Sequence, residues 1–453
     1  MITTATMATS ELCLFLHTWD PMDLVRRLGN AFEIAERAVR LLAPSGYQDP
    51  NDSTVGVSAE KVVSETVLLL LACNSVAAQY TDISSRLQKI ARLLIPHARN
   101  EQVIIRMCLN PGLAYDYAFA HICLSCLGFP DTQFDKILHL CSESEALGSR
   151  ERLPHRTLEQ EWLKRMWGSS NTKDRDEYWA VALSMLNRSI DPFTASRDDI
   201  YAFTHAIMYI SDLGGRTSRL PRAKGDILAD AETALSICLD QQDYDLCGEI
   251  LLTWPYLGAK WSATAAFAFR VLMRVEDAVG FLPAPLTRLD RYYELSDEER
   301  PRYAMATVYH TAYVMGLLCA ASLKHDRILS VVMPRSHKFN RSEILLKVID
   351  SYGNKPHWQD DFMQLETESQ NALAPMLMTI ALRHAVTGHN LEQVRSLLAF
   401  GIDNGVLNYP ATRQAAGILR RFAEVTIHSP ELAVPESTTQ RTEEPAGTDT
   451  HIA

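Results

Sequence analysis

The sequence lacks an apolar stretch long enough to cross a bilayer. Its most apolar run, VLLLLACNSVAA, spans only residues 67–78, whereas a transmembrane helix needs about 20 residues. The N-terminal segment also has neither a basic region nor a long apolar core, which argues against a signal peptide. We therefore expect a cytoplasmic protein with no membrane partner.

The chain also lacks an excess of positive charge. It has 44 Lys and Arg residues against 55 Asp and Glu residues, which gives a formal net charge of −11. Proteins that bind nucleic acids through the phosphates need a basic face, and anionic membranes attract basic segments. We therefore expect no nucleic-acid partner, and the charge argues independently against adhesion to an anionic membrane.

Several catalytic and structural signatures are missing. The nine cysteines are an odd number scattered over 453 residues, which is typical of free thiols in a reducing compartment and not of a disulfide framework. The sequence contains no Gly-rich phosphate loop, no GxSxG, no HExxH and no Rossmann fingerprint. It therefore identifies no cofactor, no metal and no reaction type.

Strand patterns are missing too, and helical periodicity dominates the chain. We predict an all-α fold of multiple helical hairpins, arranged either as an (α/α) toroid or as an irregular superhelical array. The predicted organisation is an N-terminal helical block over 1–279, a Pro-rich connecting loop over 280–301, a C-terminal helical block over 302–428 and a disordered tail over 429–453.

One short pattern occurs twice. Residues 117–121 read YAFAH, and residues 201–205 read YAFTH. On a helical wheel, the second copy belongs to a stripe that spans about 80°, and its members are Asp198, Tyr201, His205, Tyr209 and Asp212. The stripe is either a solvated polar face or the wall of a site. Two tyrosines and a histidine are unusual on a face where Lys, Glu and Arg are expected.

Two further histidines lie on segments that are apolar all round. His121 belongs to YAFAHICLSCLG, and His310 lies at the centre of YAMATVYHTAYVMGLLCAA. Such helices are expected to be buried, so each imidazole needs an internal hydrogen-bond partner. The histidines either satisfy the core locally or join His205 around one cavity.

The segment 148–168 combines basic, acidic and aromatic residues on one predicted helix. His155, Glu159 and Trp162 follow one another on a single face, and Arg152 and Arg156 lie beside them. His and Glu at this spacing form an acid–base pair or ligate a metal, and arginines bind carboxylates or phosphates. An ordinary amphipathic helix with i,i+4 pairing explains the same pattern.

The stretch DDIYAFTHAIMYISDLG resembles a family of uncharacterised all-α actinobacterial proteins that are often encoded near specialised-metabolite genes. The family motif is close to D-x-Y-A-x-T-H, followed by a Tyr and an Asp-φ-Gly. Its positions are filled here by Asp199, Tyr201, Ala202, Thr204, His205, Tyr209, Asp212 and Gly214, while Leu213 stands where an aromatic residue is usual. The resemblance implies a role in natural-product biosynthesis or in a peptide-modifying pathway, and it brings no established activity.

Two functions fit these observations. The first is a tailoring enzyme that acts on a small molecule or peptide, and the second is a helical-repeat scaffold that binds a peptide or a partner protein. For the enzyme, the candidate catalytic residues are His205, Tyr201, Asp199, Asp212, Tyr209, His121 and His310. The candidate substrate-binding residues are Arg152, Arg156, His155, Glu159 and Trp162.

Overall fold

The computed structural model describes residues 20–49, 52–144, 151–168, 175–217, 219–324, 331–332, 342–353, 356–406 and 408–428. The predicted tail at 429–453 lies outside the described residues. The helices in the first half are α2 (Pro21–Arg40), α3 (Ala59–Ala77), α4 (Thr81–Ala98), α5 (Glu101–Leu109), α6 (Ala114–Tyr117), α7 (Phe119–Cys126), α8 (Thr132–Ser142), α9 (Pro154–Met166), α10 (Arg175–Leu183), α11 (Arg197–Ile210) and α12 (Lys224–Asp240).

The second half is also helical, and the predicted all-α class is confirmed. Its helices are α13 (Tyr244–Leu251), α14 (Thr253–Tyr256), α15 (Ala263–Val279), α16 (Leu289–Glu294), α17 (Arg300–Thr307), α18 (Tyr309–Leu323), α19 (Ser342–Asp350), α20 (Trp358–Met363), α21 (Thr367–Ala372), α22 (Ala374–Thr387), α23 (Leu391–Asp403) and α24 (Pro410–His428). Short 3-10 turns occur at Pro111–Leu113 and Met185–Asn187. The strands that the structure describes form two small ribbons, antiparallel β1 (Tyr47–Asp49) with β2 (Asp52–Val57) and parallel β3 (Trp261–Ser262) with β4 (Val331–Val332).

Two helical segments that carry candidate histidines are each divided into two helices. The segment 112–127 divides at Ala118 into α6 and α7, and the segment 302–323 divides at Val308 into α17 and α18. The first YAFxH copy therefore spans a break, with Tyr117 ending α6 and Phe119 beginning α7, whereas the second copy lies wholly within α11. The same pentapeptide pattern thus has two different local structures.

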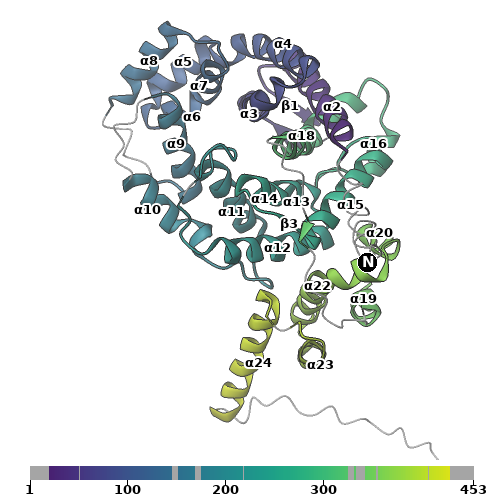
Figure 1. The fold of residues 1–453 in the computed structure, drawn as a ribbon. Helices are drawn as coiled ribbons and strands as arrows, with labels where there is room; N and C mark the ends of the chain where they lie inside the picture. The colour runs from purple at the N-terminus through teal and green to yellow at the C-terminus, as the bar shows by residue number, and fades with distance from the viewer. Residues whose placement is uncertain are drawn as a thin grey trace, which may run out of the picture.

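The helices follow one another around the molecule and return to where they began (Figure 1). Helix α18 packs against α2, α3 and α13, and Arg27 of α2 donates to Asp277 of α15 over 2.7 Å. The segment 280–301, predicted as a loop, contains the short helix α16. Helices on both sides of this segment therefore pack against one another. The division into two helical blocks and the (α/α) toroid stay predictions.

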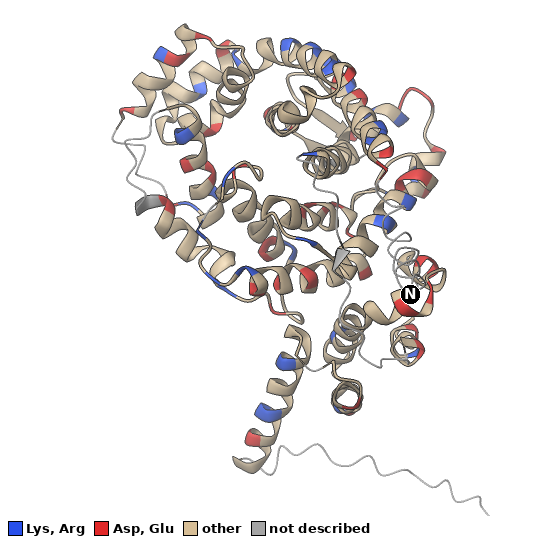
Figure 2. Cartoon of the chain, in the orientation of Figure 1, with Lys and Arg blue, Asp and Glu red and all other residues tan. Residues whose placement is uncertain are grey.

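Charged residues of both signs are interspersed over the helices, whereas α18 has no Asp, Glu, Lys or Arg (Figure 2). As predicted from its composition, α18 is almost wholly buried. Among the described residues, no single helix is long and apolar enough to cross a membrane. Helices α17 and α18 reach the length and apolar composition of a membrane span only when they are taken together, and the two helices are bent by 57° at the break between them.

Candidate functional site

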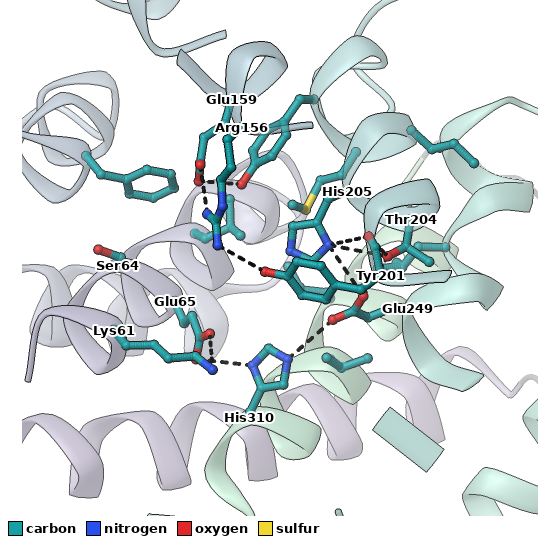
Figure 3. A pocket seen from close by; sticks show the side chains of 18 of the residues that line it. Lys61, Ser64, Glu65, Arg156, Glu159, Tyr201, Thr204, His205, Glu249 and His310 are labelled. Atoms are coloured by element: carbon teal, nitrogen blue, oxygen red, sulfur yellow. Dashed lines mark hydrogen bonds and ion pairs between the residues drawn. The ribbon is translucent and has the colours of Figure 1, made fainter. Parts of the chain in front are cut away.

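A cavity of about 420 Å³ lies between α3, α9, α11, α13, α14 and α18 (Figure 3). This volume falls within the range of small-molecule sites. Its polar lining residues are Glu60, Lys61, Ser64, Glu65, Asp116, Arg156, Glu159, Tyr201, Thr204, His205, Tyr209, Glu249, Thr253, Tyr256 and His310. The cavity therefore brings together six of the residues that the sequence singled out: Tyr201, His205, Tyr209, His310, Arg156 and Glu159.

Helix α11 supplies one wall because its N-terminus is well fixed. Ser196 and Asp199 form a capping box, in which the Ser196 side chain accepts from the backbone of Asp199, and Asp199 Oδ2 accepts from Ser196 N at 2.9 Å. Hydrogen bonds from Ser196 lower the pKa of Asp199. Asp199 does not line the cavity. The carboxylate is used at the helix start and lies outside the cavity, and its catalytic role stays a prediction.

Asp212 also departs from its predicted place in the stripe. Helix α11 ends at Ile210, and Asp212 adopts a positive φ of 50° beyond that end. The helical wheel no longer applies there, and Asp212 is not among the lining residues. Its Oδ1 instead accepts a hydrogen bond from Trp162 Nε1 at 2.7 Å. The structure thus places Asp212 and Trp162 outside the cavity, each bound to the other, and their catalytic and substrate-binding roles stay predictions.

His205 faces the cavity with one ring nitrogen already engaged. Its Nδ1 lies 3.1 Å from the carbonyl oxygen of Tyr201 and 3.6 Å from Glu249 Oε2. An Nδ1–H that donates to this carbonyl leaves Nε2 as the acceptor. The Tyr201 ring lies against the imidazole, with the ring centroids 3.7 Å apart. Burial lowers the pKa of His205, although Glu249 and Glu159 oppose this shift. The imidazole is therefore neutral at neutral pH.

A second polar group joins α9 to α11 at the cavity. Tyr209 Oη donates to Glu159 Oε1 at 2.7 Å, and Arg156 Nη1 donates to Glu159 Oε2 at 2.8 Å. The other Arg156 nitrogen, Nη2, lies 3.5 Å from Tyr201 Oη. Burial and the neighbouring Glu159 raise the pKa of Tyr209 well above its ordinary value. The Arg156 side chain stays 45% exposed, so it can reach an incoming anionic group.

Two other residues of the 148–168 segment are engaged elsewhere. Arg152 donates to both carboxylate oxygens of Asp116, at 2.9 and 2.8 Å, and to the carbonyl oxygen of Gly112. Its guanidinium is therefore unavailable to a substrate, contrary to the prediction. His155 does not line the cavity either. It lies edge-on to the Tyr201 and His205 rings, and burial together with the charge of His205 lowers its pKa to about 4.

Both ring nitrogens of His121 are engaged in the core, away from the cavity, and its predicted catalytic role stays a prediction. The fully buried ring accepts a hydrogen bond from Arg99 Nε at Nδ1, over 3.0 Å, and Nε2 lies 2.9 Å from Asp135 Oδ1. Because Arg99 can only donate, Nδ1 must be unprotonated and Nε2–H must donate to Asp135. Trp167 Nε1 donates to the same carboxylate oxygen. His121 thus joins α7 to α8, and it does not line the cavity.

His310 lies at the centre of a carboxylate cluster. Its Nδ1 is 3.1 Å from Glu65 Oε2, and its Nε2 is 3.4 Å from both Asp245 Oδ1 and Glu249 Oε1. Tyr309 Oη donates to Glu65 Oε2 at 2.6 Å. Three helices, α3, α13 and α18, therefore contribute to one ionic group on the cavity wall (Figure 3).

The cluster changes the acidity of its members. Burial alone would lower the pKa of His310, but Glu65 and Asp245 raise it well above its ordinary value. Burial opposes ionisation of Glu249, yet the electrostatic interaction with the His205 ring, together with the hydrogen bond and charge of His310, lowers its pKa to about 2. For Asp245, burial dominates and raises the pKa. Ligand atoms of Asp245, Glu249 and His310 all lie within 4.8 Å of one another.

The chain matches a family described as a domain of unknown function, DUF6895, over residues 28–320. It belongs to that family. No curated protein and no solved structure matches the chain. The DUF6895 region contains every residue that lines the cavity, from Glu60 to Leu317. The cavity therefore lies within the family domain of this chain and not among the helices that follow it.

Three residues of the site in this chain, Glu65, Asp245 and Glu249, are not among the candidates predicted from the sequence. The acidic stretch 240–249 does contain a helix cap, since Asp243 accepts from Leu246 N at 3.1 Å. Asp245 and Glu249, however, are four residues apart and share one face of α13. The spacing of four residues between these two acids was the sequence signal that could have identified them as part of the site.

Proposed function

We propose that this protein is a tailoring enzyme of specialised metabolism that performs acid–base chemistry on a small molecule or a peptide side chain held in the cavity. The observation that carries the proposal is the convergence of His205 and His310 on Glu249. Their ring nitrogens lie 3.6 Å from Oε2 and 3.4 Å from Oε1 of this one carboxylate. The metabolic context rests on the sequence resemblance alone.

His205 is the proposed general base. A neutral imidazole whose Nδ1 is oriented by a carbonyl oxygen presents Nε2 to a substrate proton, which is the usual arrangement for histidine bases. Glu249 lies on the Nδ1 side, where its negative charge stabilises the imidazolium formed when Nε2 accepts the proton. Tyr201 Oη, 3.5 Å from Arg156 Nη2, is placed to donate a hydrogen bond to the oxygen of a bound substrate.

The lining also offers groups for substrate binding. Thr253 Oγ1 and Tyr256 Oη are buried, and neither has a hydrogen-bond partner among the described residues. Both residues line the cavity. Buried hydroxyls without a partner carry a desolvation cost that a polar ligand removes. Together with the exposed guanidinium of Arg156, they favour a substrate that has hydroxyl or carbonyl groups and one anionic group.

The test compares metabolites from a deletion strain with those from strains complemented by the wild-type, His205→Ala or His384→Asn protein. His384 is the control because its Nε2 is 2.8 Å from Asp240 and outside the cavity. We expect a product that disappears on deletion and on His205→Ala but persists with His384→Asn. A product made equally well by the His205→Ala protein would disprove the catalytic role.

A second function, binding of a protein partner, is favoured by α24. This helix projects away from the other helices (Figure 1), and its last two turns expose Phe422, Val425 and Ile427. Exposed apolar side chains on one helix are typical of protein-binding surfaces. Deletion of 410–428 would abolish partner binding while leaving the cavity chemistry intact, since α24 lies outside the family domain.

A further inference from the structure

We propose that Asp245, Glu249 and His310 form a binding site for a divalent transition-metal ion. One imidazole nitrogen and two carboxylate oxygens are a common three-residue ligand set for such ions, and they leave further coordination positions for water or substrate. Glu249 and His310 line the cavity, so the remaining positions open into it. The site does not depend on His205 acting as a base.

The spacing of the ligand atoms fits a metal better than it fits direct hydrogen bonds. His310 Nε2 is 3.4 Å from Asp245 Oδ1 and 3.4 Å from Glu249 Oε1. N–H···O hydrogen bonds usually have lengths of about 2.7–3.2 Å. Metal–ligand bonds of about 2.1 Å in a tetrahedral site separate neighbouring ligand atoms by roughly 3.4 Å. The two distances from His310 Nε2 therefore match the edges of a coordination tetrahedron, and all three ligand atoms lie within 4.8 Å of one another.

Asp245 supplies an independent observation. The residue is only 7% exposed, and its Oδ1 has no hydrogen-bond partner in the part of the chain that the structure describes. This oxygen faces Nε2 of His310. Leaving a buried carboxylate oxygen without a donor is costly, and a bound cation removes that cost.

Each proposed ligand is also held from behind by another residue. Asp245 Oδ2 accepts from Arg197 Nη2 at 2.7 Å, and Glu249 Oε2 accepts from Thr204 Oγ1 at 2.7 Å. This leaves Asp245 Oδ1 and Glu249 Oε1 to face the metal position.

On the far side of the His310 ring, Nδ1 lies 3.1 Å from Glu65 Oε2, which is an ion-pair contact without hydrogen-bond geometry. A carboxylate behind a ligating histidine fixes the ring and strengthens it as a ligand, which is the usual arrangement around protein-bound metals. Glu65 is itself oriented by the hydroxyl of Tyr309.

The local charge favours a cation. Three carboxylates, Glu65, Asp245 and Glu249, surround one imidazole. Their cationic neighbours lie on the outer side of the group, with Lys61 3.6 Å from Glu65 and Arg197 bound to the far oxygen of Asp245. A divalent ion between Asp245, Glu249 and His310 would replace the proton on His310 Nε2 and balance the two carboxylates that face it.

The test measures metal binding directly on the full-length, untagged protein. Protein stripped with a chelator is titrated with Zn²⁺, Mn²⁺ or Co²⁺, and bound metal is counted by elemental analysis after gel filtration. We expect one ion per chain for at least one of these metals, and a cobalt spectrum typical of nitrogen and oxygen ligands. Asp245→Asn and His310→Gln should lose this binding, and Glu65→Gln should weaken it about 10- to 100-fold.

Asp240→Asn is the matched control, since Asp240 pairs with His384 at 2.8 Å and has no third ligand among the described residues, and it should bind metal like the wild type. Circular dichroism of the metal-free variants shows whether each has folded. If Asp245→Asn is unfolded, Glu249→Gln and the wild-type cobalt spectrum decide the question. Substoichiometric metal, unchanged binding in the folded site variants, or a thiolate charge-transfer band from the cysteines would overturn the proposal. None of these readouts measures product, so they leave the His205 mechanism to its own test.

Discussion

Gly248 of α13 lies directly against Val314 of α18: a Cβ atom built on Gly248 would be 2.5 Å from Val314 Cγ1. Real Cβ atoms do not approach other atoms so closely. In the sequence of α13, Gly248 lies between Asp245 and Glu249. His310 lies in the first turn of α18. The absence of a side chain at Gly248 therefore sets the distance between the two helices that carry the proposed metal ligands.

Replacing Gly248 should separate these helices. We expect Gly248→Ala to lower the free energy of unfolding by about 1–3 kcal/mol, which is typical of an overpacked core, and to weaken metal binding. The double variant Gly248→Ala/Val314→Ala removes the clashing methyl group and should recover part of both losses. Urea denaturation and metal titration of the two single variants and the double variant measure this coupling, and strictly additive losses would contradict it.

Arg27 should be a major source of stability because it joins distant parts of the chain. Its side chain is 2% exposed and forms ion pairs with Asp23 of its own helix and with Glu276 and Asp277 of α15. Removing one partner of a buried ion pair costs about 3–5 kcal/mol, since the remaining charge stays buried. We expect Arg27→Met to lose stability in that range by urea denaturation.

The adjacent Arg26 is the natural control for Arg27. It also contacts Asp23 and Asp277, but its side chain is 51% exposed. Exposed ion pairs contribute at most about 1 kcal/mol. Arg26→Met should therefore cost much less than Arg27→Met, and equal losses would show that burial of the Arg27 group contributes nothing.

Stability should fall in mild acid because His121 is buried in its neutral form. Burial lowers its pKa below the ordinary value of 6.5, although Asp135 opposes the shift and Arg99 and Asp131 also lie nearby. As the pH falls, His121 therefore takes up a proton at a higher pH in the unfolded chain than in the folded chain. The stabilisation is complete above about pH 6.5 and decreases below it, by at most about 1.4 kcal/mol per pH unit for one proton.

His121→Gln tests this because glutamine keeps polar groups but does not titrate. Chemical denaturation at pH 7.5 and pH 5.5 should show a smaller difference for the variant than for the wild type. The carboxylates and the other histidines, including His155, titrate in both proteins and cancel in this comparison. An unchanged pH dependence would mean that His121 is not held neutral.

The bond between Trp162 and Asp212 should stabilise the end of α11. Trp162 is fully buried, and its Nε1 donates to Asp212 Oδ1 at 2.7 Å. Hydrogen bonds to charged groups contribute about 1.5–3 kcal/mol, so Trp162→Phe should lose at least that much in thermal or urea unfolding. Trp179→Phe, at a tryptophan that is 55% exposed, should change stability little.

The sequence predicts local features of this fold well. The helical wheel placed Tyr201, His205 and Tyr209 on one face, and all three line the cavity. It failed for Asp212, because no sequence signal before Gly214 showed that α11 ends at Ile210. The YAFxH repeat likewise suggested equivalent helices, yet the first copy spans the break at Ala118.

Partners from distant segments could not be predicted in the same way. The burial of His121 follows from its apolar neighbours, but its hydrogen bonds come from Arg99 on one side and Asp135 on the other. Glu65 and His310 meet only because α18 packs against α3. Periodicity describes which face of a helix is buried, and it contains no information about which other helix will cover that face.

The position of α18 in the chain has a consequence for synthesis. It follows α2, α3 and α13 in sequence but packs against all of them, and it brings His310 to their carboxylates. A nascent polypeptide on the ribosome cannot complete this cluster until α18 has left the exit tunnel. A ligand of the cluster would therefore bind only chains that have been translated past α18, and it could stabilise only the folding steps that follow.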